Sequence, residues 1–257
     1  MDLTTILGMI FATTSISVGD ILEGGNPLHV IHLSSVLIVI PTAMCCAITS
    51  VHKKSLKNAF KELKIAFTGA KVNLGERIAQ IVDFSIVARR DGLLALESRT
   101  NEIDNDFLRS ALMMLVDGKS FDEIRETMEI QTEELEEHYK EAGEYWILAG
   151  ETCPTMGLVG AVMCLMLALQ KLDNPQEMAM GISGAFTATV TGIFASYALF
   201  TPWGRKMIAN GKDYVKEQIV IAEGIKGIAE GANPRDLEAK LFNYLSHDDA
   251  RISQFEK

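Results

Sequence analysis

Ionisable side chains are missing from two long stretches of this 257-residue sequence. Residues 178–203 contain no Asp, Glu, Lys, Arg or His over 26 positions, and residues 152–170 contain only two cysteines that could ionise. A soluble helix has no need to be apolar all round for so long, whereas about 20 apolar residues cross the hydrocarbon core of a bilayer. Helices also satisfy their own backbone groups in lipid. The two stretches therefore predict membrane-spanning helices.

Other absences exclude whole classes of function. The net charge of −10 argues against a nucleic-acid binder. The five histidines include no HExxH motif, no glycine-rich phosphate loop follows a strand pattern, and no Ser/His/Asp order suggests a hydrolase. The four cysteines lie in apolar segments without metal-ligand spacing, so we interpret them as small hydrophobic residues. We expect no enzyme, no cofactor and no metal site.

Two further apolar segments lie near the start of the chain. Leu3–Gly19 is rich in Thr and Ser and lacks the basic leading region of a signal peptide. Leu28–Val51 has 24 residues, interrupted only by His29 and His32 near one end and Pro41 in the middle. The two histidines are interpreted as a pair at the membrane interface, with a proton relay as the alternative. The sequence thus predicts four spans.

Basic residues follow the second and fourth of these segments, which sets their orientation. His52-Lys-Lys-Ser-Leu-Lys57 follows one, and Gly204-Arg-Lys206 follows the other. The connector 20–26 has two acids and no base, and the connector 171–177 has one lysine. The positive-inside rule then places both termini in the cytoplasm. The prediction is an all-α integral membrane protein with spans 1 and 2 in residues 1–51, a helical cytoplasmic domain in 52–146, spans 3 and 4 in 147–203, and cytoplasmic C-terminal helices in 204–257.

Apolar residues recur at three- and four-residue spacing in the predicted cytoplasmic parts, which indicates amphipathic helices. Such helices are expected over Lys53–Phe67, Glu76–Leu96, Phe107–Val116 and Phe121–Trp146, and from Asn233-Pro234 onward. Asp104–Asp106 and Ser120 are the expected N-caps of the third and fourth. The fourth lacks proline, so it is predicted to continue into the third span.

The last two spans are lined with small and hydroxylated residues instead of charges. They include Thr155, Gly157, Gly160, Ala161, Gly181, Ser183, Gly184, Thr187, Thr189, Thr191 and Gly192. Ordinary close helix packing explains most of these positions. Ion pathways usually carry an ionisable residue within the membrane, and here all acids lie near segment ends. A transporter with a self-contained site is therefore disfavoured.

Three local motifs carry a resemblance to a known family. They are Arg89-Arg-Asp-Gly-Leu-Leu-Ala-Leu-Glu97, Cys153-Pro-Thr-Met-Gly-Leu-Val-Gly-Ala161, and Gly184-Ala-Phe-Thr-Ala-Thr-Val-Thr-Gly192 with Phe200-Thr-Pro202. In this order, on a plan of two spans, a large cytoplasmic insert and two spans, they resemble the MotA-type stators of the flagellar motor. These belong to a wider family that includes ExbB and TolQ. The resemblance covers essentially the whole chain.

The resemblance implies partners that supply what the spans lack. MotA-type proteins form a homopentamer around a dimer of MotB, whose single transmembrane helix provides the essential aspartate. Thr155 and Thr189 would then line the partner-facing ion pathway in the bacterial inner membrane. In sodium-driven relatives, the position of Ala161 is a threonine associated with sodium. Alanine removes that oxygen ligand, so protons are the expected coupling ion.

The resemblance also assigns roles outside the ion pathway. Arg89, Arg90 and Glu97 match the charges that contact the rotor protein FliG, and the doubled arginine leaves open which base dominates. Pro154 and Pro202 match prolines that couple ion passage to conformational change. On one continuous helix, Arg89 and Glu97 would lie about 80° apart in azimuth and about 12 Å apart along the axis. The alternative is an ExbB- or TolQ-like energiser of outer-membrane transport, but that branch typically has one span before its large loop.

The orientation of the spans can be tested with a membrane-impermeant label on intact cells. We expect labels at Asn26 and Asn174 to react from outside, and labels at Lys119 and Lys240 to react only after permeabilisation, because the basic clusters hold their segments in the cytoplasm. Reaction of Lys119 in intact cells would refute the four-span assignment.

Overall fold

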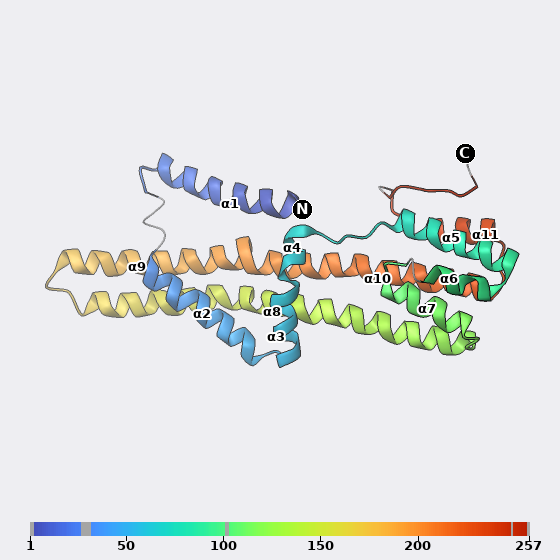
Figure 1. Cartoon of the computed structure of the whole chain (residues 1–257). Coiled ribbons are helices and arrows are strands. Elements are labelled where there is room, and N and C mark those ends of the chain that lie inside the picture. Colours follow the sequence, from blue (N-terminus) through green and yellow to red (C-terminus); the bar gives the residue numbers. More distant parts are fainter. Residues whose placement is uncertain (1–2, 27–31, 101–102, 248, 256–257) are drawn as a thin grey trace. The chain divides into compact units, whose positions relative to one another are not determined.

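The structure, a computed structural model, describes residues 3–26, 32–100, 103–247 and 249–255. Every regular element in these ranges is helical, as predicted (Figure 1). In chain order they are α1 (Leu3–Leu22), α2 (Leu33–Thr49), α3 (Lys53–Lys61), η2 (Glu62–Lys64), α4 (Ile65–Thr68), α5 (Leu74–Asp91), η3 (Leu93–Leu96), α6 (Glu97–Thr100), α7 (Asp106–Val116), α8 (Phe121–Leu169), α9 (Pro175–Phe194), η4 (Ala195–Phe200), α10 (Thr201–Ala229) and α11 (Pro234–Phe242).

The chain divides into two compact units. The first comprises the residues up to Gly69 together with His138–Asn210, and the second comprises Ala70–Glu137 together with the residues from Gly211 onward. The long helices α8 and α10 each contribute to both units. We call these the first and the second unit.

Three helices are long and apolar enough to cross a membrane. They are α1, α8, and the continuous helical stretch Pro175–Ala229. The apolar helix α2 is shorter, at 17 residues. Part of the predicted second span, residues 28–31 with His29, lies outside the described residues. His32, the other histidine of the predicted interfacial pair, is described, and Ser34 Oγ lies within hydrogen-bonding distance of its Nδ1, at 2.7 Å.

The predicted helix starts and continuations agree with the structure. Ser120 forms a capping box with Glu123: Glu123 N donates to Ser120 Oγ at 3.3 Å, and Ser120 N donates to Glu123 Oε2 at 3.1 Å. The helix that follows, α8, runs unbroken for 49 residues, so the acidic helix does continue into the apolar segment. Asn105 and Asn233 accept backbone hydrogen bonds as the caps of α7 and α11.

In the first unit, α8 packs closely against α9 and α10. The closest approaches occur at small residues: Gly143, Gly150 and Gly157 of α8, and Gly192, Thr201 and Gly204 of the opposing helices. An added Cβ on Gly157 would lie 2.9 Å from Ala188 O, and one on Gly143 would lie 2.6 Å from Gly204 O. Small residues let helix backbones approach in this way, which matters where lipid provides no hydrophobic drive for association.

An aromatic cluster joins α3 and α4 to the same helices. Trp146 and Trp203 meet edge to face with ring centroids 5.5 Å apart, and Phe60 and Phe67 pack on them at 5.2 and 5.6 Å. Trp146 Nε1 donates to Ala59 O at 3.0 Å. Asn210 Nδ2 donates to Ile65 O at 2.8 Å. These bonds hold α3 and α4 across α8 and α10 (Figure 1).

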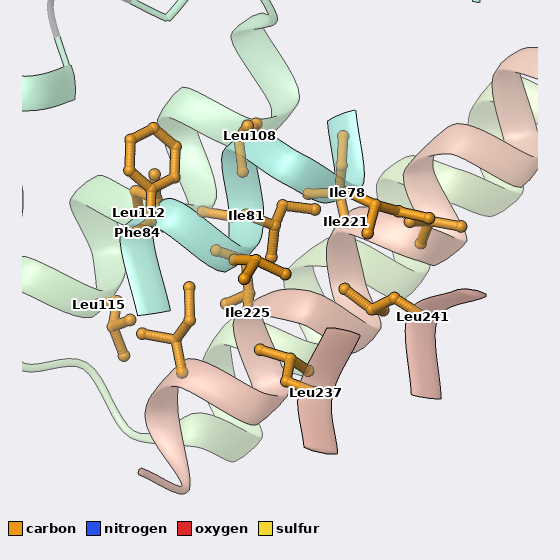
Figure 2. Packing of buried hydrophobic residues seen from close by; sticks show 14 of the residues in the cluster. Ile78, Ile81, Phe84, Leu108, Leu112, Leu115, Ile221, Ile225, Leu237 and Leu241 are labelled. Atoms are coloured by element: carbon orange, nitrogen blue, oxygen red, sulfur yellow. The ribbon is translucent and has the colours of Figure 1, made fainter. Parts of the chain in front are cut away.

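The second unit has its own hydrophobic core, drawn in Figure 2. It combines side chains of α5, α7, α10 and α11: Ile78, Ile81, Phe84, Leu108, Leu112, Leu115, Ile221, Ile225, Leu237 and Leu241. The apolar spacing predicts Ile78, Ile81, Val82, Ser85 and Ile86 for one face of α5; the first four are buried, and Ile86 is partly buried against the core. Of the residues that the spacing of the terminal helix predicts, Leu237 and Leu241 are buried, and Phe242 and Leu245 are partly buried against the core.

A buried ion pair and the C-terminal tail complete this unit. Arg77 Nε donates to Glu217 Oε1 at 2.8 Å, and the two side chains are only 14% and 10% exposed. The tail crosses the start of α5, where the Ala250 carbonyl occupies the space that a Cβ on Gly75 would need. Glu238, which is buried, accepts from Ser253 Oγ at 2.8 Å and from Gln254 N at 2.7 Å. The tail therefore belongs to the fold of the second unit.

The close packing of α8 predicts a position-dependent cost of one methyl group. A Cβ on Gly150 would overlap Thr201 Oγ1 and lie 2.9 Å from Thr201 N. We expect Gly150→Ala to lower stability by about 1–3 kcal/mol, as overpacking does. Gly8→Ala in α1 is the control, since nothing lies within 4 Å of its added Cβ.

Thermal unfolding in detergent measures both variants. Gly8→Ala should be neutral or stabilising by up to about 1 kcal/mol, because alanine favours helix over glycine. Equal midpoints for the two variants would contradict the close approach at Gly150.

Candidate functional site

The hydroxyl groups of the last two apolar helices fall on different faces. Ser35 Oγ and Thr187 Oγ1 lie 3.3 Å apart, and they join α2 to α9. Thr191 Oγ1 donates to Thr187 O at 2.7 Å and shares this face. Thr189 lies about 200° around the helix from both Thr187 and Thr191 at 100° per residue. Thr187 is therefore engaged in packing inside the chain, whereas Thr189 faces another direction.

Thr155 and Thr189 retain acceptor capacity. Thr155 is exposed on α8, and its hydroxyl donates to Thr152 O at 2.7 Å. Thr189 is half-buried and donates to Ala185 O at 3.2 Å. A hydroxyl has one donor and two acceptor lone pairs, so each oxygen can still accept a bond from water or from a partner group. Ala161 differs from both, because it is only 7% exposed and offers no oxygen.

No cluster of metal ligands exists in the described ranges. Of the cysteines there, Cys153 is buried, immediately before Pro154. The carboxylates of the two connectors remain at helix ends: Glu177 near the start of α9 accepts from Lys171 Nζ at 2.9 Å. This ion pair lowers the pKa of Glu177, which keeps it charged. Within the described part of α8 and α9, no carboxylate, histidine, lysine or arginine lies between these ends and the prolines, and Cys164 is the one ionisable side chain there.

The two prolines lie beside one contact. Gly150 is four residues before Pro154, and it packs against Thr201, which directly precedes Pro202. Proline removes a backbone donor and clashes with the preceding turn. Around Pro154, α8 remains helical without interruption. Before Pro202, the chain forms the π-helical turn η4 instead. A departure from α-helical geometry thus accompanies Pro202 and not Pro154.

Arg89 and Arg90 lie in the last turn of α5, and both are exposed. Arg90 Nη2 donates to Asp91 Oδ2 at 2.7 Å, which raises the pKa of Arg90 and lowers that of Asp91. No ion pair joins Arg89 to any residue in the described part of the chain. The guanidinium of Arg89 is therefore the one of this pair that is available to another molecule.

The prediction that one helix runs from Glu76 to Leu96 is wrong. Gly92 has φ +88°, a conformation that side chains with a Cβ rarely adopt, and α5 ends at Asp91. A 3-10 turn follows, and Glu97 begins α6. The azimuth and axial separation expected for Arg89 and Glu97 on one helix therefore do not apply. Glu97 itself is exposed.

One contact in this region was not foreseen from the sequence. Arg99 Nη2 donates to Asp83 Oδ2 at 3.0 Å, and the Arg99 guanidinium lies 5.9 Å from the centroid of the Phe84 ring. The contact ties α6 to α5 across the break at Gly92. The two residues are 16 positions apart and lie on different helices, so no helical spacing in the sequence indicates this contact.

Comparison with known proteins decides the family. The sequence profile of the MotA/TolQ/ExbB proton channel family matches residues 99–219. Motility protein A of Helicobacter pylori is 58% identical over 256 residues, which cover 100% of both chains. The chain belongs to the MotA/TolQ/ExbB proton channel family. This family consists of channels, not enzymes.

Two solved structures extend the similarity to the fold. The structure of C. jejuni MotAB matches with a TM-score of 0.96 and 78% identity, and covers 99% of this chain and 100% of that chain. The flagellar MotAB stator complex of Bacillus subtilis matches with a TM-score of 0.87 and 34% identity, covering 96% and 97%. The all-helical architecture of this MotA/TolQ/ExbB family member is therefore shared along its whole length.

The different surroundings of the two prolines generate a prediction. Pro202→Ala restores a backbone donor next to η4, so we expect the π turn to shorten or shift and motility to be lost with normal protein level and membrane insertion. Pro154→Ala, inside an already continuous helix, tests whether the coupling needs a bend at all. Swimming rate and immunoblots measure both; normal swimming by both variants would remove the prolines from the coupling.

Proposed function

We propose that this protein is the stator subunit of a bacterial flagellar motor, which forms with MotB a proton channel that converts ion flow into torque. The observation that carries this function is the full-length match to C. jejuni MotAB, at 78% identity and a TM-score of 0.96. Relatives named Motility protein A extend over the whole chain, which favours the stator over an ExbB- or TolQ-like energiser.

The ion pathway is proposed to lie between this chain and its partner. Because the spans carry no carboxylate away from their ends, the single helix of MotB supplies the aspartate that takes up the proton. Thr155 and Thr189 accept hydrogen bonds beside it, since both retain acceptor lone pairs. Ala161 supplies no oxygen ligand, which supports protons over sodium.

Assembly is proposed to be a homopentamer around a MotB dimer in the inner membrane. The support is the apolar surface that one chain leaves uncovered. No residue of α1 is buried, and Phe186 of α9 is 70% exposed. Lipid, MotB and neighbouring copies would share these faces, because in a bilayer apolar exposure alone does not distinguish between them.

The proposed topology has four spans and both termini in the cytoplasm. Three spans have sufficient length, and α2 is taken as the fourth with residues that precede it. The membrane part then lies in the first unit, within residues 1–51 and 147–203. The second unit, with residues 52–69, 138–146 and 204–210 of the first, forms the cytoplasmic part.

Torque is proposed to pass through Arg89, Arg90 and Glu97 to FliG. Arg89 is the dominant base in this proposal, because Arg90 is engaged by Asp91. Exposed charge pairs contribute only about 0–1 kcal/mol each, so such contacts form and break quickly as the ring turns.

A charge reversal tests the function and the choice between the arginines. We expect Arg89→Glu to reduce swimming severalfold at unchanged protein level, and Arg90→Glu to reduce it less. A compensating charge reversal on FliG should partly restore the swimming of the Arg89→Glu strain. The measurement is swimming speed in a strain that lacks the native gene and expresses each variant.

Two results would count against this assignment. Loss of the assembled complex in Arg89→Glu would give the residue a structural role. An equal or larger defect in Arg90→Glu would reverse the order of the two arginines. Full complementation by the wild-type chain is the control, and its failure would contradict the stator function itself.

A further inference from the structure

A row of lysines distinguishes the segment that follows α2 from the rest of an acidic chain. Residues 53–64 contain five lysines in a protein of net charge −10, and all five are exposed: Lys53, Lys54, Lys57, Lys61 and Lys64. The single acid among them, Glu62, turns inward, where its Oε1 lies 3.4 Å from His138 Nε2 and 3.5 Å from Lys61 Nζ. Positive charge therefore collects on the outer side of this segment.

The lysines share one face of α3. At about 100° per residue, Lys53, Lys54, Lys57 and Lys61 fall within an arc of about 100°. Buried residues on the other side hold the helix to the protein. Ser55 Oγ donates to Glu141 Oε2 at 2.7 Å, and Asn58 Nδ2 lies 3.0 Å from His138 Nδ1. These contacts fix the direction of the lysine face, away from α8.

The remaining face of α3 is apolar. Leu56 and Phe60 lie beside the lysines, within about 60° of Lys53 at 100° per residue. Phe60 is 49% exposed although it packs on Trp146. An amphipathic helix with adjoining basic and apolar faces is suited to the boundary between lipid headgroups and acyl chains. The long lysine side chains can reach the headgroups while their stems cover apolar surface.

The position of the segment also points to the bilayer surface. It begins four residues after the apolar helix α2 ends at Thr49. Trp146 packs on Phe60 of the segment and Trp203 packs on Phe67 just beyond it, and tryptophan is enriched at membrane interfaces. In Figure 1, α3 and α4 cross the apolar helices instead of running along them. On α8, the contact lies at Trp146, which donates to Ala59 and precedes the apolar residues 152–170. A segment that crosses a spanning helix just outside its apolar part is placed to lie along the membrane surface.

We propose that the lysine face of residues 53–64 is a binding site for the phosphate headgroups of anionic phospholipids. Clusters of four to eight basic residues directly beside a membrane helix or on an amphipathic helix favour anionic lipid, by roughly fivefold for each charge near the surface. Only one part of this proposal rests on the proposed function, namely that the site faces the cytoplasmic leaflet. In a ring of identical subunits, it would surround the stator with a belt of bound anionic lipid.

The tryptophans provide a local probe of this site. Trp146 and Trp203 are the two tryptophans of the sequence. The full chain is reconstituted in phosphatidylcholine vesicles with increasing fractions of brominated phosphatidylglycerol or brominated phosphatidylcholine, which quench nearby tryptophan fluorescence. We expect brominated phosphatidylglycerol to quench at an at least threefold lower fraction. The preference should vanish in about 1 M salt, where the Debye length falls to about 3 Å.

Matched variants separate the lysine face from the general effect of charge. In the triple variant Lys53→Gln, Lys57→Gln and Lys61→Gln, both brominated lipids should quench the tryptophan fluorescence equally. The control Lys71→Gln, Lys119→Gln and Lys212→Gln removes the same charge from exposed positions of the second unit and should keep the preference. The triple variant Lys53→Arg, Lys57→Arg and Lys61→Arg keeps the charge and should also keep the preference for phosphatidylglycerol. Helical content by circular dichroism confirms that each variant is folded.

Equal quenching by the two lipids in the wild type would overturn the proposal, as would a preference that survives in the glutamine triple variant or in high salt. If the glutamine variant does not fold, the wild-type preference, its salt dependence and the arginine variant still decide. Quenching does not depend on which side of the bilayer the segment faces or on torque. An error in the proposed topology or in the stator function would therefore appear in the labelling and swimming experiments, and it would leave this quenching measurement unchanged.

Discussion

Direct contact between helix backbones organises the first unit. Where α8 meets α9 and α10, glycines and small side chains bring the helices so close that an added methyl group at Gly150 or Gly157 meets backbone atoms. In lipid, close packing of this kind must hold helices together, because the lipid tails provide no hydrophobic drive for association. The same two long helices continue into the second unit, where Ile221 and Ile225 of α10 join a conventional hydrophobic core. The same pair of helices thus packs through close backbone contacts in the first unit and through a hydrophobic core in the second.

Much of the helical layout could be predicted from the sequence, because local chemistry determines it. The cap at Ser120, the proline after Asn233, and the apolar spacing of Ile78 and Ile81 each specify an element within a few residues. The break at Gly92 was missed, although glycine after a basic last turn is a usual helix end. The apolar residues after it, Leu93–Leu96, continued the pattern and masked the stop.

The candidate site was less predictable, since it depends on contacts between distant residues. The sequence shows several threonines in the last two spans, but only the partner on α2, Ser35, reveals that Thr187 is used for packing. Likewise, the sequence does not indicate which of the two adjacent arginines is available for a contact. The ion pair of Arg90 with Asp91 favours Arg89. The contact of Arg99 with Asp83 needs the fold itself. Residue roles that rest on the family alone, such as Glu97, gain from the structure only their exposure.

The π-helical turn before Pro202 affects how the residues beyond it should be compared with those before it. A wider turn accommodates one more residue than an α-helical turn, so it acts as a one-residue insertion in the middle of a continuous helix. Every side chain after Phe200 is therefore rotated by about 100° relative to the position that a straight α-helix through Met178 would give it. A helical wheel drawn across this point would assign the wrong face to the whole of α10. The phase between the membrane segment and the helix that follows is thus a property of six residues, 195–200, and not of the long helices on either side.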